Sequence, residues 1–173
     1  HGAPTPVTAF LSIAPKGAAL AILLRIFIVA LGTFKPTWIY LIVAVSIVSM
    51  TYGNIVAIAQ RNIKRLLAYS GIAQIGNLLI GLAAGTKMGN DAILFYLLAY
   101  LFANLGAFAV VIAVSQAIGR DEIEDYRGLG RRSPFLAFSM LLFLLSLAGV
   151  PPLAGFIGKL YIFIAAIKEG LYT

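Results

Sequence analysis

The chain has 173 residues, of which 61% are hydrophobic and 11% are charged, and its formal net charge is +7. Soluble domains carry about 25% charged residues, so this composition excludes a water-facing surface and predicts an all-α, multi-pass transmembrane bundle. The sequence lacks cysteine and has a single histidine, His1, which argues against disulfides, iron–sulfur clusters, zinc and haem. We therefore expect a lipid bilayer as the surroundings, no cofactor in this chain and, despite its positive charge, no nucleic-acid partner.

Five apolar segments are long enough to cross a bilayer, which takes about 20 helical residues. The sequence predicts them at residues 7–31, 38–60, 66–84, 91–118 and 134–167. As one straight helix the last segment would be about 51 Å long, against a hydrocarbon core of about 30 Å. Gly149, Pro151 and Pro152 predict where it breaks, because proline lacks the N–H that the helical ladder needs.

Two lysines lie inside these apolar segments. Lys16 follows Pro15 in the first segment, and Lys159 lies just past the Gly-Pro-Pro break in the last. A charge at the bilayer centre costs about 2.5–3.5 kcal/mol, and unwound backbone beside a charge is typical of ion sites in transporters. We interpret both lysines as proton-exchanging amines on interrupted helices. The alternative is that each side chain reaches an interface and serves only as an anchor.

Polar side chains within the segments could line a hydrated path between the lysines, or only join helices through hydrogen bonds. They are Asn54, Tyr69, Ser70, Gln74, Asn77, Tyr100 and Asn104. Lys64, one turn into the third segment, either holds its loop together with Arg61 and Arg65 or takes part in a proton relay. The first, second, third and fifth segments contain no Asp or Glu, so the opposite charge that tunes the lysines has to come from elsewhere.

Basic residues divide unequally between the two ends of the predicted bundle. One end receives Lys35, Lys87 and Lys168. The other receives Arg61, Lys64, Arg65, Arg120, Arg127, Arg131 and Arg132. The richer end is predicted to be cytoplasmic. The loop at 119–133, which mixes arginines with acids, is expected to be solvated there.

Several segments together resemble the antiporter-like membrane subunits of respiratory complex I, most closely the N-type. They are GAPTPVTAFLS at 2–12, PK at 15–16, AQRNIKRLLAYS at 59–70, YLFANLGAF at 100–108, YRGL at 126–129 and LAGVPPLAGFIGK at 147–159. Asn104 stands where L-type relatives tend to carry a lysine. The family often has a serine in place of Gly71, and a histidine or glutamine at the position of Gln74.

The resemblance implies a module of two inverted helix bundles with a row of buried charges through the membrane centre. Lys16 matches its central connecting lysine, and Lys159 matches the lysine of the second broken helix, towards the outlet half-channel. The family's glutamate–lysine pair would precede His1. Residues 1–173 are therefore expected to form a single transmembrane domain, the C-terminal part of a module whose N-terminal half is missing.

The expected function is proton translocation coupled to quinone reduction in other subunits of a proton-translocating NADH:quinone oxidoreductase. Lys16 and Lys159 would be the relay, and its support would come from Lys64, Tyr69, Gln74, Asn104, Pro151 and Pro152. The expected partners are other membrane subunits, protons and bound water, in a bacterial inner membrane. The alternatives are a Mrp-type cation/proton antiporter subunit and a membrane anchor that translocates nothing.

Overall fold

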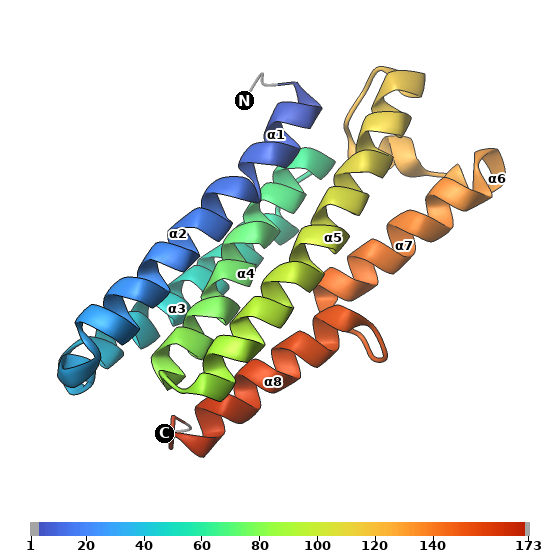
Figure 1. Cartoon of the computed structure of the whole chain (residues 1–173). Helices are drawn as coiled ribbons and strands as arrows, with labels where there is room; N and C mark the ends of the chain where they lie inside the picture. Colours follow the sequence, from blue (N-terminus) through green and yellow to red (C-terminus); the bar gives the residue numbers. More distant parts are fainter. Residues whose placement is uncertain (1–3, 172–173) are drawn as a thin grey trace.

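Helices make up nearly all of residues 4–171, which are the residues that the computed structural model describes, and this part contains no β-strand (Figure 1). The all-α prediction is confirmed. The elements in chain order are α1 (Thr5–Leu11), α2 (Ala14–Leu24), the π-helix η1 (Arg25–Ala30), the 3-10 turn η2 (Gly32–Phe34), α3 (Lys35–Ile58), α4 (Ile63–Ala84), α5 (Lys87–Ile118), the 3-10 turn η3 (Ile123–Tyr126), α6 (Leu129–Arg132), α7 (Pro134–Ala148) and α8 (Ala154–Lys168).

Four helical stretches of the described chain are long and apolar enough to cross a membrane. They are Thr5–Ala30, Gly32–Ile58, Ile63–Ala84 and Lys87–Ile118. The fifth predicted segment is divided into α7 and α8, which follow one another across the bundle (Figure 1). The predicted break at Gly149, Pro151 and Pro152 is confirmed, because α7 ends at Ala148 and α8 begins at Ala154.

Several helices begin earlier than predicted, because polar residues cap their first turns. The Asn62 side chain accepts hydrogen bonds from the backbone N–H groups of Lys64 and Arg65, so α4 starts three residues before its apolar run. Thr86 caps α5 in the same way through the N–H of Gly89. Hydropathy alone does not detect such starts, since the capped turns are themselves polar.

The helix that carries Lys16 is also interrupted, as Pro15 predicted. The chain leaves the helical ladder at Ser12 and Ile13 and re-enters it at Ala14. The ring of Pro15 removes the N–H that would otherwise bond the carbonyl of Leu11. Lys16 and Lys159, both half-buried, therefore lie close to a helix interruption.

The connections on each end of the bundle contact one another. An isolated antiparallel bridge joins Asn62 to Glu122, and the Lys64 ammonium pairs with the Asp121 carboxylate at 2.6 Å. The 119–133 loop is therefore tied to the start of α4 and is not simply solvated. Partial burial, with Asp121 and Asp125 nearby, raises the pKa of Tyr126 in this loop to about 12.

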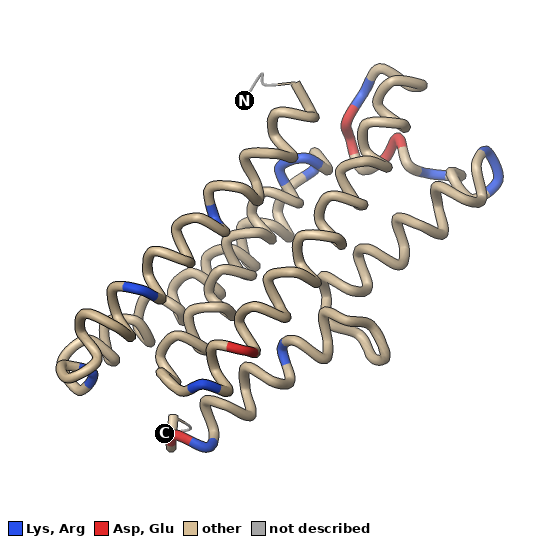
Figure 2. Tube along the Cα trace, in the orientation of Figure 1, with Lys and Arg blue, Asp and Glu red and all other residues tan. Residues whose placement is uncertain are grey.

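The opposite end is held by Lys35. Its ammonium donates to the Ala84 carbonyl at 2.6 Å and pairs with Glu169 at 3.1 Å. The two groups of basic residues thus lie at opposite ends, as predicted, and a few isolated charges remain in the apolar middle (Figure 2). Which end faces the cytoplasm stays a prediction.

Candidate functional site

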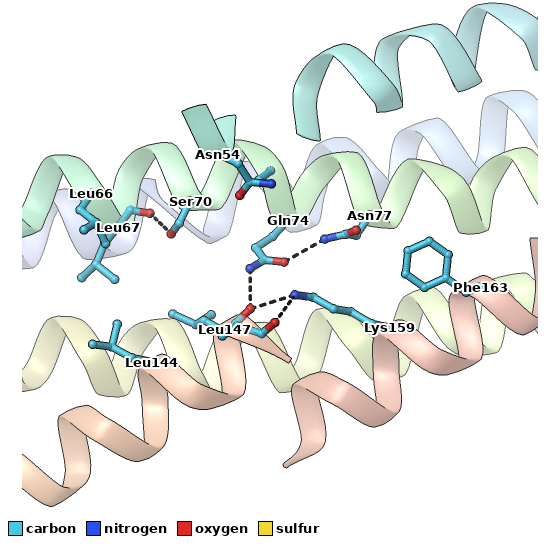
Figure 3. Close-up of a pocket in the computed structure, with 12 residues that line it drawn as sticks. Asn54, Leu66, Leu67, Ser70, Gln74, Asn77, Leu144, Leu147, Lys159 and Phe163 are labelled. Carbon is cyan, nitrogen blue, oxygen red and sulfur yellow. Dashed lines mark hydrogen bonds between the residues drawn. The ribbon is translucent and has the colours of Figure 1, made fainter. Parts of the chain in front are cut away.

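The Lys159 side chain lies at the break between α7 and α8. Its ammonium donates to the carbonyl of Leu147 at 3.0 Å and to that of Ala148 at 3.1 Å (Figure 3). These are the last carbonyls of α7, and the break leaves them without the usual N–H four residues on. Gly149 has φ +84°, which turns the chain out of the helix, and an added Cβ there would lie 3.2 Å from the Lys159 nitrogen.

The end of α7 supplies the compensating charge that no acidic side chain provides. Within residues 4–171 the ion pairs are Lys35–Glu169 and Lys64–Asp121, so neither Lys16 nor Lys159 has a carboxylate partner there. The C-terminus of a helix carries about half a negative charge, and a cation in its last turn is stabilised by it. The broken helix is therefore the local counter-charge of Lys159.

Gln74 shares one of these carbonyls with Lys159. Its amide nitrogen donates to the Leu147 oxygen at 2.9 Å (Figure 3). Its amide oxygen accepts a bond of 3.1 Å from Asn77 and another from the hydroxyl of Tyr96. Gln74 is buried, and these bonds fix its orientation.

A cavity of about 450 Å³ opens beside the Lys159 ammonium (Figure 3). It is lined by Asn54, Leu66, Leu67, Ser70, Ala73, Gln74, Asn77, Leu144, Leu147, Ala148, Lys159 and Phe163. Along α4 it extends towards Leu66, which lies near the end with the arginine-rich loops. The polar lining suits ordered water, since each amide or hydroxyl can bond to it. The position of Lys159 towards the outlet half-channel, which the resemblance implies, stays a prediction.

The Lys16 ammonium has a different environment. It donates to the hydroxyl of Tyr100 at 3.1 Å, and this hydroxyl donates a long bond of 3.4 Å to the Ser12 carbonyl. The amide of Asn104 donates to the Ser12 hydroxyl at 2.8 Å. We call these four residues and Gly71, which faces the ammonium, the Lys16 site. Tyr100 and Asn104 are buried, so the ammonium contacts the interior of the bundle.

The remaining predicted residues are dispersed. Lys64 lies at the end of the bundle in its ion pair with Asp121. Tyr69 is half-buried on α4, where its carbonyl faces α3, and it neither lines the cavity nor bonds to either lysine. Pro151 and Pro152 are exposed in the break. Their roles in a relay stay predictions.

Two residues that contact the candidate sites were not predicted from the sequence. Tyr96 contacts Gln74 beside Lys159, and Ser12 lies beside Lys16. Tyr96, Tyr100 and Asn104 are spaced by four residues on α5, which puts them on one face of the helix. We call Lys159, Gln74 and the carbonyls of Leu147 and Ala148 the Lys159 site. Tyr96 bonds to Gln74 at the Lys159 site and Tyr100 bonds to Lys16, so this face of α5 joins both sites. The sequence spacing could have predicted this shared face, whereas the partner of each hydroxyl depends on how the helices pack.

Two half-buried lysines at helix breaks, one of them beside a partly polar cavity, define a class of protein: a multi-pass membrane bundle with charges among its apolar helices. The whole chain, residues 1–173, matches the family described as NADH:quinone oxidoreductase/Mrp antiporter, TM. The chain belongs to this family and is a multi-pass integral membrane protein.

Named relatives and solved structures agree with this assignment. The chain is 52% identical to the NADH-quinone oxidoreductase subunit N of Moorella thermoacetica, over 98% of this chain and 36% of that protein. It superposes with a TM-score of 0.82 and 38% identity on a chain of respiratory complex I from Thermus thermophilus, covering 99% of this chain and 37% of that one.

A chain of an archaeal membrane-bound sulfane sulfur reductase is also similar, with a TM-score of 0.86 and 29% identity. That match covers 97% of this chain and 35% of the other. The chain thus spans about a third of the length of the curated relatives it matches.

Proposed function

We propose that this chain is part of a membrane subunit that moves protons across the bilayer, coupled to quinone reduction in other subunits of a complex I-like NADH:quinone oxidoreductase. The observation that carries the proposal is the Lys159 site. An ammonium without a carboxylate partner in the described chain is held by two carbonyls at a helix break and adjoins a cavity with a partly polar lining. A lysine amine gains and loses a proton within reach of such groups, which a guanidinium does not.

In this proposal the proton passes between Lys16 and Lys159 along the polar face of α5 and through bound water. Tyr100 touches Lys16, and Tyr96 reaches the Lys159 site through Gln74. A side-chain amide orders its neighbours but does not itself exchange protons readily, so water in the cavity completes the path. Charge on one lysine opposes charge on the next, which makes the two sites load and empty in sequence.

The names of the relatives support the coupling to quinone reduction. We place NADH oxidation and quinone reduction in other subunits, since the sequence has no cysteine and one histidine to offer redox centres. We further propose that residues 1–173 form one transmembrane unit, the C-terminal part of an antiporter-like module. The partners are then the other membrane subunits of the complex, and this chain acts as a translocase component.

Replacing Lys159 tests this function in the assembled complex. Proton uptake by inverted membrane vesicles and the quinone reductase rate are measured together for Lys159→Ala. Coupled proton uptake should fall by about tenfold or more, since proton transfer by a positioned group typically contributes 10²–10⁴-fold. The matched control is Lys168→Ala, because Lys168 ends the same helix and is exposed, and within residues 4–171 its ammonium hydrogen-bonds to the Met88 sulfur alone, at 3.7 Å.

Normal proton uptake and reductase activity in the assembled Lys159→Ala complex would refute the relay and leave Lys159 as a structural anchor. The same vesicle assay shows whether the transported ion is a proton alone or a proton exchanged for sodium. A Mrp-type exchange would make proton movement depend on added sodium, whereas the proposed relay is indifferent to it. The cavity offers only an ammonium as a charged group, and hard cations prefer oxygen ligands of opposite charge.

A further inference from the structure

Gly155, in the first turn of α8, lies directly against the end of α7. A Cβ atom built at this position would overlap the carbonyl oxygen of Ser146 and lie 2.8 Å from its carbonyl carbon. The backbone N–H of Gly155 also donates to the Ser146 hydroxyl at 3.3 Å. Since the carbonyl belongs to the backbone, no side-chain rotation could make room for a larger residue. The two helices therefore approach as closely here as a glycine allows.

Lys159 follows Gly155 by four residues, so both lie on the same face of α8. Gly155 contacts Ser146, and the Lys159 ammonium bonds to the carbonyls of the next two residues of α7. The turn after α7 supplies backbone N–H donors to the two carbonyls before those, from Gly149 and Val150. The ammonium thus provides the donors that the turn does not supply, and it reaches them from a helix that Gly155 holds close.

We propose that Gly155 is a positioning residue, whose contact with Ser146 sets the separation of α7 and α8 at which the Lys159 ammonium bonds to the end of α7. This inference rests on the proposed function in so far as it assigns a role in proton transfer. Its geometric content, that residue 155 determines whether Lys159 reaches those carbonyls, is independent of that function.

An alanine at position 155 would change where the start of α8 lies. The φ of Gly155 is outside the left-handed region, so alanine suits the backbone and would ordinarily favour the helix. The added methyl group must push the first turn of α8 away from the backbone of α7. The second half of α8 is held by the buried residues Ile162, Ala165 and Ala166. The displacement therefore falls on the turns that carry Gly155 and Lys159, and the bonds from the ammonium lengthen.

The first test is proton uptake per assembled complex, in a double-mutant cycle of Gly155→Ala, Lys159→Ala and the two combined. We expect Gly155→Ala to lower uptake by about tenfold, since small misplacements of a reacting group have effects of this size or larger. In the Lys159→Ala background it should have no further effect. Normal uptake by Gly155→Ala, or a loss by the same factor in both backgrounds, would overturn the inference.

Gly17→Ala is the matched control for this substitution. Gly17 also lies in a membrane helix, and its Cβ would meet Leu97 at 4.0 Å, which is an ordinary contact. Its proton uptake should remain near that of the wild type. An equal loss in both glycine variants would show that the close approach to Ser146 is not the cause, and would also overturn the inference.

Thermal inactivation of the assembled complexes tests the geometry without reference to pumping. With Gly155 present, Lys159→Ala removes both bonds to the end of α7 and should lower the inactivation temperature. With alanine at position 155 these bonds are already weakened, so Lys159→Ala should have a smaller effect. Equal effects of Lys159→Ala in the two backgrounds would refute the role of Gly155.

Ser146→Ala keeps the inference testable if Gly155→Ala prevents assembly. It removes the acceptor of the Gly155 N–H and adds no atom to the contact. Proton uptake should fall by about twofold to tenfold, the factor by which one hydrogen bond shifts an equilibrium, and should not fall further when Lys159 is already alanine. Ser139→Ala, two turns earlier on the same face of α7, controls for loss of a serine hydroxyl. Normal uptake by Ser146→Ala in that case would overturn the inference.

The two proposals fail separately in this design. Normal pumping by Lys159→Ala would refute the proposed relay, and the thermal cycle would still decide whether Gly155 positions Lys159. Additive thermal effects together with a loss of pumping in Lys159→Ala would instead keep the relay and refute the role of Gly155.

Discussion

Lys159 and Lys16 both lie beside an interrupted helix, yet their ammonium groups have different hydrogen-bond partners. Lys159 bonds to two backbone carbonyls at the end of α7. Lys16 bonds to one side-chain hydroxyl, that of Tyr100, and fills the volume left by a glycine. Backbone groups therefore hold the Lys159 ammonium, whereas a side-chain hydroxyl holds the Lys16 ammonium in space next to a glycine.

The difference predicts how each site responds to substitution. The carbonyls at the Lys159 site persist whatever side chains surround them, as long as the helix stays broken. Lys16 loses its hydrogen-bond partner with a single hydroxyl and keeps only the face of the Tyr100 ring, whose centroid lies 5.4 Å from the ammonium. Around Lys159, substitution of a neighbouring side chain should therefore lower the stability of the complex more than it lowers proton uptake. Around Lys16 the order should be reversed, with proton uptake affected more than stability.

The largest effect on stability is expected for Gln74→Leu, which keeps the volume but removes both ends of the amide. The buried Tyr96 hydroxyl and the Asn77 amide lose their common acceptor, at a cost of about 1–3 kcal/mol. Lys159 keeps both carbonyls, so proton uptake should fall less than in Lys159→Ala. Thermal unfolding of the complex and vesicle proton uptake measure the two effects.

Gln60→Leu is the control for this prediction, because within the described chain the Gln60 amide bonds only to the carbonyl of Val56 in its own turn, at 3.0 Å. Its effect on stability should be small. If Gln74→Leu assembles normally yet abolishes proton uptake as fully as Lys159→Ala, the Lys159 site depends on side chains and the contrast between the two sites is wrong.

Tyr100→Phe tests the other half of the comparison. It removes the only hydrogen-bond partner of the Lys16 ammonium in the described structure and keeps the ring in place. The expected loss of stability is about 1 kcal/mol, smaller than for Gln74→Leu, while proton uptake should fall more. Tyr161→Phe, on the exposed side of α8, controls for loss of a tyrosine hydroxyl elsewhere. Normal uptake by Tyr100→Phe would show that Lys16 does not need this contact.

Much of the fold followed from hydropathy and proline. The five apolar segments and the break at Pro151 and Pro152 were predictable, because lipid requires long helices and proline interrupts their ladders. Helix starts were predicted late at Asn62 and Thr86, since capping turns are polar. The bridge between Asn62 and Glu122 was not predictable, because it joins loops separated by two helices.

Less of the candidate site was predictable. Lys16 and Lys159 stand out as charges in apolar segments, but the groups that compensate them do not. The carbonyls of Leu147 and Ala148 carry no signal in residue type, and the bond from Lys16 to Tyr100 depends on how α2 and α5 approach one another. Tyr96 was missed because its hydroxyl becomes significant only through its contact with Gln74.

The smallest effect is expected where Lys64 pairs with Asp121, at the end of the bundle and away from Lys16 and Lys159. Lys64→Met removes an ion pair whose side chains are 21% and 24% exposed, at a cost of about 0.2–1 kcal/mol. Proton uptake should be unchanged, because this ammonium holds the 119–133 loop through Asp121. Arg65→Met is the control, since Arg65 is exposed and makes no ion pair within residues 4–171.

The alternative, that Lys64 passes protons to the cavity, makes the opposite prediction for the same pair. A relay role requires the amine itself, so Lys64→Met would lower proton uptake while Asp121→Ala, which frees the amine, would not. If the ion pair only holds the loop, it requires both partners. The two substitutions would then reduce stability equally, and the double variant would be no less stable than either single variant. If both substitutions lower stability equally and leave proton uptake unchanged, Lys64 is excluded from the proposed relay, which then involves only Lys16 and Lys159.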